Sequence, residues 1–529
     1  MKNAAADTGR IAKSAGMVSF AVMCSRVLGL VREQVFAVMF GAGTAYDAFV
    51  VAFRIPNLLR DLFGEGALSS AFVTVFTARR TTGRAEDAWR LANNVLSFFA
   101  VFVGALTLFG ILASRSLVGL LAPDFALVAD KVALTTRLTA IMFPFLVFIS
   151  LASVVMGILN SWGRFFVPAM ASSFFNLGSI LGGVALALLL PRFGQPAIVG
   201  MAVGTLLGGI LQLGWQLPSL YRCGFRLRLR IDLGDPDLRR IFRLMVPAIV
   251  GLSATQFNIF VNTYFASSCA EGSVSWLNYA FRLVQFPIGV FGVALSIAAQ
   301  PVFAGYAARK DLAGMRSAFS SSMVMVFCLT IPATVGLLLL ARPIVAVIFQ
   351  HGAFTGFDTE QTAQALSYYS LGLFAYASVK VMVPVFYALD DTRYPVVASF
   401  MAVAVNVLII LAALDAMQHR VIALATSSSM AGSFLFLGVM LYRKMGGFPV
   451  RHLFSGAGKV AAASLVMGGG LLAAIRLFPA PAHLAMQIVR LLLLIAGAGG
   501  LYAVALHLLR LQEMQAIAGK LAARLRGRS

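Results

Sequence analysis

The sequence predicts an all-α, polytopic membrane protein with fourteen transmembrane helices. Hydrophobic residues make up 60% of the 529 residues and charged residues only 12%. That composition leaves too few polar side chains to cover the surface of a water-soluble domain. Apolar runs long enough to span a bilayer recur from end to end. Their length and lack of alternation exclude an outer-membrane barrel.

Windows of about 20 residues divide the chain into fourteen candidate spans, of which the first two are the least apolar. In chain order they cover residues 15–40, 46–78, 91–113, 133–159, 167–190, 196–221, 241–266, 274–303, 317–341, 362–388, 395–414, 421–442, 456–478 and 484–509.

The distribution of basic residues predicts the orientation. If the amino terminus is cytoplasmic, most of the 42 lysines and arginines lie on the cytoplasmic side, as cytoplasmic loops require. Six lie on the outer side: Arg115, Lys131, Arg192, Arg342, Arg420 and Arg476. A missed span would invert every later loop and destroy this asymmetry. The count therefore predicts that both termini are cytoplasmic, and it explains the net charge of +22 without nucleic acid as a partner.

An internal duplication organises these spans. The segment from Ala52 reads AFRIPNLLRDLFGEGALSS and the segment from Ala280 reads AFRLVQFPIGVFGVALS, and further matches follow in order at offsets of 225 to 229 residues. Six spans separate equivalent positions, so the two halves have parallel topology, as in many transporters. We expect an N-lobe at 1–221 (spans 1–6), a basic cytoplasmic linker at 222–240, and a C-lobe at 241–442 (spans 7–12). Residues 443–529 hold spans 13 and 14 and a basic cytoplasmic tail.

Several charged side chains fall inside the spans, where each costs roughly 2.5–3.5 kcal/mol unless it lines water or a binding site. Arg26 and Arg32 lie in the first span, and Arg54 and Arg282 hold equivalent positions in the two halves. Arg32 with Glu33, and Arg60 with Asp61, have structural pairing as an equal alternative. Guanidinium groups bind phosphate in bidentate fashion and stay charged. Their convergence on one cavity between the lobes predicts a phosphate or diphosphate ligand.

Three blocks carry a family resemblance: SRVLGLVRE in span 1, YDAFVVAFRIPNLLRDLFGEGALSSAFV in span 2 and NYAFRLVQFPIGVFGVALS in span 8. They closely resemble the MurJ/MviN-type lipid II flippases of the multidrug/oligosaccharidyl-lipid/polysaccharide exporter superfamily, and the resemblance covers essentially the whole chain. It implies a multi-pass transporter of the bacterial inner membrane that serves peptidoglycan synthesis, cell wall biogenesis and cell shape. Its implied substrate is lipid II, the undecaprenyl-diphosphate-linked precursor, moved from the inner to the outer leaflet.

The resemblance also implies a substrate site. Its main members are four arginines, Arg26, Arg32, Arg54 and Arg282, and the same motif blocks add Ser25, Asp47, Asn57 and Glu65. The resemblance further implies that spans 13 and 14 form an apolar groove for the lipid tail, in which each buried CH₂ contributes about 0.8 kcal/mol.

One departure from the family pattern concerns sodium. Some members are proposed to bind sodium in the second lobe through carboxylates, but the aligned positions here are Asn262, Asn406 and Thr426. Neutral side chains make a poor sodium site, which puts sodium coupling in question. We expect no other cofactor, because the four cysteines lie far apart and form no metal or disulfide pattern.

The predicted activity is transport by alternating access, with lipid II and membrane lipids as partners and a monomer as the working unit. Two alternatives stay open, namely a flippase for another lipid-linked oligosaccharide and a drug or cation antiporter of the same superfamily. An enzyme is not expected, since the five histidines lie at loop or late-helix positions without a catalytic cluster.

Overall fold

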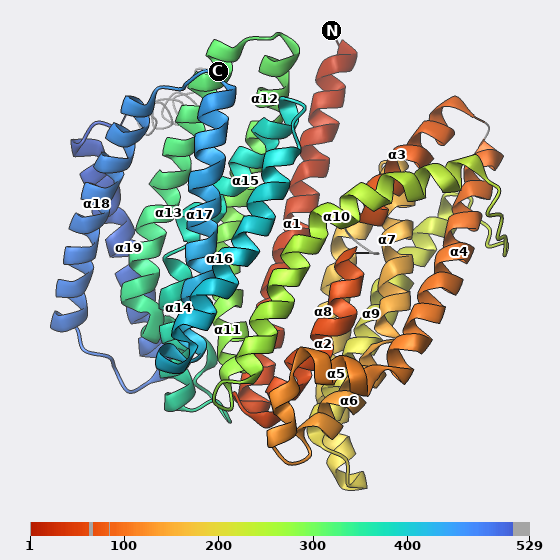
Figure 1. The fold of residues 1–529 in the computed structure, drawn as a ribbon, viewed down its shortest axis with the longest axis horizontal. Helices are drawn as coiled ribbons and strands as arrows, with labels where there is room; N and C mark the ends of the chain where they lie inside the picture. Colours follow the sequence, from red (N-terminus) through yellow and green to blue (C-terminus); the bar gives the residue numbers. More distant parts are fainter. Residues whose placement is uncertain (1, 63–66, 84, 512–529) are drawn as a thin grey trace. The chain divides into compact units, whose positions relative to one another are not determined.

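The computed structural model describes residues 2–62, 67–83 and 85–511, which are helices joined by short connections (Figure 1). No β-strand occurs among these residues, so the all-α fold class is confirmed. The chain forms two compact units, residues 1–275 and 276–529.

The described residues of the first unit form ten α-helices. They are α1 (Lys2–Phe40), α2 (Thr44–Arg60), α3 (Ala67–Thr82), α4 (Ala85–Leu112), α5 (Ser114–Leu121), α6 (Lys131–Met142), α7 (Phe145–Ser161), α8 (Phe166–Leu189), α9 (Ala197–Arg222) and α10 (Pro236–Ser267). Short 3₁₀ turns, η2 (Pro123–Leu127) and η3 (Leu190–Phe193), follow α5 and α8. Its core is built from aromatic and aliphatic side chains of α3, α4, α7 and α10, with Phe72, Phe76, Phe99 and Phe145 fully buried.

Small residues bring α8 and α9 into close contact. Gly200, Gly204 and Gly208 repeat every four residues along α9, and a Cβ built on Gly204 would lie 2.4 Å from the Cα of Gly183 on α8. Helices in lipid associate largely through such close backbone packing, because apolar burial gains little there. The glycine spacing therefore explains why α8 and α9 pack so closely. The helix α1 also packs against α8.

The second unit contains the remaining helices. They are α11 (Ser273–Pro287, whose first turn belongs to the first unit), the π-helical turn η4 (Ile288–Val293), α12 (Ala294–Ala308), α13 (Leu312–Phe349), α14 (Gly356–Ser370), α15 (Leu373–Ala388), α16 (Arg393–Met417), α17 (His419–Lys444), α18 (Val450–Leu477) and α19 (Leu484–Leu508). Its main core joins α12, α13, α15, α16 and α17, and α18 packs against α13 and α19.

Eleven helical segments of the described chain are long and apolar enough to cross a membrane, or twelve if the bent pair α14–α15 is one span. Each corresponds to a span expected from the sequence. The two expected spans outside this set are the first two, which form α1 and the pair α2–α3 and carry the most charge. The structure thus shows a multi-pass helical protein, whereas the count of fourteen and the side on which the termini lie stay predictions.

Two expected spans leave the regular α-helical form at corresponding places. In the second span, α2 ends at Arg60 and residues 61 and 62 are π-helical. In the eighth span, α11 ends at Pro287 and the helix continues through the π-helical turn η4 into α12. The two α-helix ends are 227 residues apart, which matches the duplication found in the sequence. Such π-helical turns inside helices occur frequently at functional sites.

The helix α10 packs against α3 within the first unit, although the repeat assigns it to the second half. The sequence repeat divides the chain before α10, whereas the contacts divide it after α10. The lobe boundaries therefore stay a prediction.

Candidate functional site

The described charged residues of the candidate site lie on α1, α2 and α11. Arg26 is exposed on α1, with Ser25 half-buried beside it, and Arg54 and Asn57 are half-buried on α2. Arg282 is exposed on α11 in the second unit. Glu65 lies outside the described residues. The first unit therefore gathers most of the expected residues on two neighbouring helices, and the convergence of Arg54 with Arg282 stays a prediction.

Arg32 has an internal partner. Its Nη2 donates to Oε1 of Glu33 at 3.0 Å, and its guanidinium lies 5.4 Å from the centre of the Phe175 ring. The Tyr46 hydroxyl donates to the other Glu33 oxygen at 2.6 Å. Glu33 is almost fully buried, so these donors compensate its charge. The pairing that the sequence left as an alternative is present, and it orients Arg32 on the α1–α2 junction.

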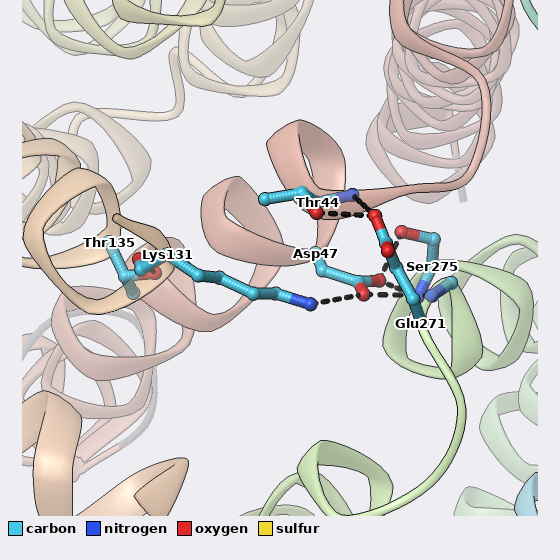
Figure 2. A network of polar contacts seen from close by, with 7 residues as sticks. Thr44, Asp47, Lys131, Thr135, Glu271 and Ser275 are labelled. Carbon is cyan, nitrogen blue, oxygen red and sulfur yellow. Dashed lines mark hydrogen bonds and ion pairs between the residues drawn. The ribbon is translucent and has the colours of Figure 1, made fainter. Parts of the chain in front are cut away.

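Asp47 is the centre of a buried polar network (Figure 2). Lys131 Nζ donates to its Oδ2 at 2.9 Å, together with the Gly272 backbone N–H at 3.0 Å. Its Oδ1 accepts from the Ser275 hydroxyl at 2.6 Å and the Ser275 N–H at 3.0 Å. Only 2% of the Asp47 side chain and 3% of the Lys131 side chain are exposed. One carboxylate thus joins the starts of α2, α6 and α11.

Glu271 adds a second contact between the same segments (Figure 2). It accepts from the Thr44 backbone N–H at 2.8 Å and from the Thr44 hydroxyl. The hydroxyl bond from Thr44, assisted by its backbone N–H and by the charge of Lys131, lowers the pKa of the Glu271 carboxyl. The connection between α10 and α11 is therefore attached to the start of α2 by two carboxylates.

A third carboxylate lies where α2 ends. Asp61 accepts from Arg60 Nη2 at 2.8 Å and from Nε at 3.1 Å, and Gln256 Nε2 of α10 donates to its other oxygen at 3.1 Å. The predicted pairing of Arg60 with Asp61 is present. It connects the end of α2 to α10, inside the first unit.

The sequence did not identify several of these residues. Lys131 was counted as an outer-loop charge, yet it is buried against Asp47 and lies 4.1 Å from the Phe125 ring centre. Glu271 and Gln256 carried no motif. In the second unit, Trp276 Nε1 donates to Asp358 at 2.9 Å, and the His419 ring lies 5.0 Å from Trp276. The spacing of Thr355 and Asp358 is that of a capping box, and it would have indicated the helix start that the structure shows at α14.

The residues aligned with a sodium site lie in different parts of the chain. Asn262 is on α10 in the first unit, and Asn406 and Thr426 are buried on α16 and α17 in the second. Thr426 donates its hydroxyl to the Ile422 carbonyl of its own helix at 2.8 Å. In the part of the chain that the structure describes, no three His, Cys, Asp or Glu residues are grouped to hold a metal ion.

Comparison with known proteins gives consistent matches. The family described as lipid II flippase MurJ matches residues 36–510. A probable lipid II flippase MurJ from Vibrio cholerae is 37% identical over 478 residues, covering 88% of this chain and 89% of that protein. A lipid II flippase MurJ from Burkholderia cenocepacia is 33% identical over 397 residues, covering 74% and 75%.

Solved structures agree with these matches. A lipid II flippase MurJ in an inward closed conformation has a TM-score of 0.75 at 26% identity and covers 92% of this chain and 99% of its own. An inward-facing MATE-family multidrug resistance transporter has a TM-score of 0.68 and covers 80% and 94%. At 13% identity the second match shows a shared fold alone.

Proposed function

The chain belongs to the lipid II flippase MurJ family, and from that premise we propose how it moves lipid II across the bacterial inner membrane. Membership makes it a multi-pass lipid transporter rather than a water-soluble protein. We propose that the diphosphate is held by the arginines of α1, α2 and α11 while the polyprenyl tail stays in lipid, and that transport runs from the inner to the outer leaflet.

One observation carries this proposal: the carboxylates described on α1 and α2 are engaged within the first unit. Glu33 is bonded to Arg32 and Tyr46, Asp47 to Lys131 and Ser275, and Asp61 to Arg60 and Gln256. Arg26 extends from the same helices with an exposed side chain. The wall formed by α1 and α2 therefore has positive character, which suits a diphosphate.

The same observation separates the alternatives. A drug or cation antiporter needs carboxylates that face its substrate, and these three are already hydrogen-bonded to protein donors. A flippase for another lipid-linked oligosaccharide would use the same arginines, because its linkage is the same diphosphate. Family membership favours lipid II over that candidate.

We propose alternating access as the mechanism. The two halves expose the arginine site first inward and then outward. An inside-negative potential favours outward movement of an anion by roughly 2.3 kcal/mol per charge per 100 mV. That energy supplies a direction without a sodium site, for which Asn262, Asn406 and Thr426 offer no carboxylate.

The two extra helices suit the lipid tail. Apolar side chains of α18 and α19, among them Leu465 and Leu493, are largely exposed. Such a surface accommodates a polyprenyl chain, because its apolar side chains offer the chain dispersion contacts like those of the surrounding acyl tails. We propose that the monomer is the working unit, since one chain supplies both repeats and these two helices.

Gene replacement in cells depleted of their own lipid II flippase tests the proposal. The wild-type chain should restore growth, and Arg54→Ala and Arg282→Ala variants that insert normally should not. Arg137→Ala is the matched control, because Arg137 is an exposed arginine on α6 outside the family motifs. Rescue by all variants would refute the arginine site.

Transport in proteoliposomes tests the driving force. With lipid II in the vesicles, imposing an inside-negative potential should accelerate flipping at constant sodium. Flipping that follows sodium and ignores the potential would contradict this mechanism while leaving the substrate assignment intact.

A further inference from the structure

The chain between α9 and α10 is an extended segment that lies along α4 (Figure 1). The Asn93 side chain donates to the Arg226 carbonyl at 3.0 Å and accepts from the Arg228 N–H at 2.7 Å. Ser97 accepts from the Arg230 N–H at 3.1 Å. Asn94 makes the corresponding pair of bonds, 2.9 and 2.8 Å, with the backbone of Asp232. The side chains of α4 thus form hydrogen bonds with the backbone of this segment, in the place of the backbone groups of a neighbouring β-strand.

These bonds fix which way the side chains point. In an extended chain the N–H and C=O of alternate residues face the same side, and successive side chains point to opposite faces. The backbone groups of residues 226, 228, 230 and 232 face α4. Arginines therefore occupy one face of the segment, and leucine and isoleucine the other. The apolar side chains are strongly exposed: Leu227 59%, Leu229 88%, Ile231 53% and Leu233 59%.

The position along α4 indicates what covers this apolar face. Asn93, Asn94 and Ser97 lie inside the candidate membrane span Glu86–Leu112 and are buried. At 1.5 Å per residue, Ser97 is about 16 Å along that helix from Glu86. The helices that the segment joins, α9 and α10, are themselves candidate spans. The segment thus lies along the N-terminal half of a candidate span, toward the end of that span rather than its middle.

The charge balance indicates which lipid. Seven arginines lie between residues 222 and 243, with three aspartates among them. All three aspartates are engaged: Asp232 by Arg230, Asp237 by Arg79, and Asp235 by the backbone N–H groups that begin α10. On the segment itself, Arg226 and Arg228 remain as excess positive charge, which suits a phosphate-bearing, negatively charged surface.

We propose that residues 225–233 form an interfacial strand that binds anionic phospholipid. In this arrangement Leu227, Leu229 and Ile231 enter the boundary of the acyl chains, and Arg226 and Arg228 contact headgroup phosphates. Phe225, buried against Trp89 at 5.7 Å between ring centres, fixes the start of the strand. The partner is a phospholipid such as phosphatidylglycerol, in the leaflet that the basic residues predict to be cytoplasmic, and it is distinct from the transported lipid.

Native mass spectrometry of the full chain released from nanodiscs tests the charge contact. The discs contain phosphatidylcholine alone or equal parts phosphatidylcholine and phosphatidylglycerol, and lipid II is absent, so the result does not depend on transport. The variant Arg226→Gln/Arg228→Gln keeps every backbone bond to α4, and it should weaken phosphatidylglycerol retention by roughly 30-fold. The matched control Arg240→Gln/Arg243→Gln removes the same charge from α10 and should retain the lipid. Equal losses in both variants, or no loss in the first, would overturn the proposal.

The depth of the strand gives an independent measurement. A fluorophore on Leu229→Cys, in a chain whose four natural cysteines are replaced by serine, should be quenched by nitroxide-bearing lipid and protected from aqueous iodide. Quenching by iodide instead would place this face in water or against a soluble partner, and would refute the interfacial strand.

Discussion

Asp47 and Lys131 form a buried ion pair between helices that are 84 residues apart in sequence, with Nζ and Oδ2 at 2.9 Å. The remaining acceptor capacity of Asp47 is filled by Gly272 and Ser275. A buried charge pair is tolerable when its other hydrogen bonds are also made, and the loss of one partner is then costly. The pair therefore holds the starts of α2, α6 and α11 in one arrangement.

Replacing Lys131 should destabilise the protein. Lys131→Met keeps much of the side-chain volume but leaves the Asp47 carboxylate buried with neutral donors only, which costs about 3–5 kcal/mol. We expect a clearly lower unfolding temperature in detergent, whereas Arg192→Met, at an exposed site on the same predicted side, should change little. The double variant Asp47→Asn/Lys131→Met should lose less than the sum of the single changes. Additive losses would argue against direct coupling.

The Tyr46 hydroxyl should stabilise the pair of Arg32 and Glu33. Tyr46→Phe removes one donor from a buried carboxylate, and hydrogen bonds to charged groups contribute about 1.5–3 kcal/mol. Tyr394→Phe is the matched control, because the contacts found for that ring are aromatic ones, with Phe386 and Phe436. Equal unfolding temperatures for the two variants would show that the bond to Glu33 contributes no net stability.

The contact between Thr44 and Glu271 should make stability depend on pH. The pKa of Glu271 is lowered in the folded protein, mainly by the Thr44 hydroxyl. Its contribution is therefore complete above the ordinary carboxyl pKa and disappears as the pH falls through the folded value. Thr44→Val keeps the backbone donor and should unfold at a lower temperature than wild type at neutral pH. That gap should close on acidification, and in a Glu271→Gln background no pH-dependent gap should remain.

Asn94 should control the release of the segment between α9 and α10. Asn94→Ala removes both bonds to Asp232 and a third contact to Asp235 at 3.3 Å. We expect faster trypsin cleavage after Arg226, Arg228 and Arg230 in detergent, located by mass spectrometry. Ser97→Ala removes one bond and should have a smaller effect. Unchanged cleavage in Asn94→Ala would show that other contacts hold the segment.

Much of the fold could be predicted because apolar length and basic-residue asymmetry are properties of the chain itself. Each candidate span among the described helices falls where a span was expected, and the repeat offset of 227 residues reappears between the ends of α2 and α11. The π-helical residues that follow α2 and α11 were not predicted, since hydropathy windows average over the few residues at which a helix changes its hydrogen-bonding pattern.

The candidate site was predicted in part. The motif blocks named Arg26, Arg32, Arg54 and Asp47 as candidates, and their role in binding stays a prediction, whereas no periodicity indicated Lys131 as the partner of Asp47. That pairing depends on the packing of α6 against α2, which the local sequence does not specify. A lysine in an outer loop ordinarily faces water, so its burial was not expected. The pairing of Glu33 with Arg32 could be suggested because the two residues are adjacent in sequence. The bond from Gln256 to Asp61 could not, because it depends on the packing of α10 on α3.

The sequence by itself determined the class of protein and the positions of most of its long apolar helices, and it predicted the duplication and the arginines inside the spans, because composition, period and charge are properties of the chain. The tertiary structure alone decided which of those charges are compensated. Asp47, Glu33 and Asp61 obtain donors from Lys131, Tyr46 and Gln256, which are 84, 13 and 195 residues away in sequence. Electrostatic compensation depends on distance in space and on burial, and neither is encoded in local spacing.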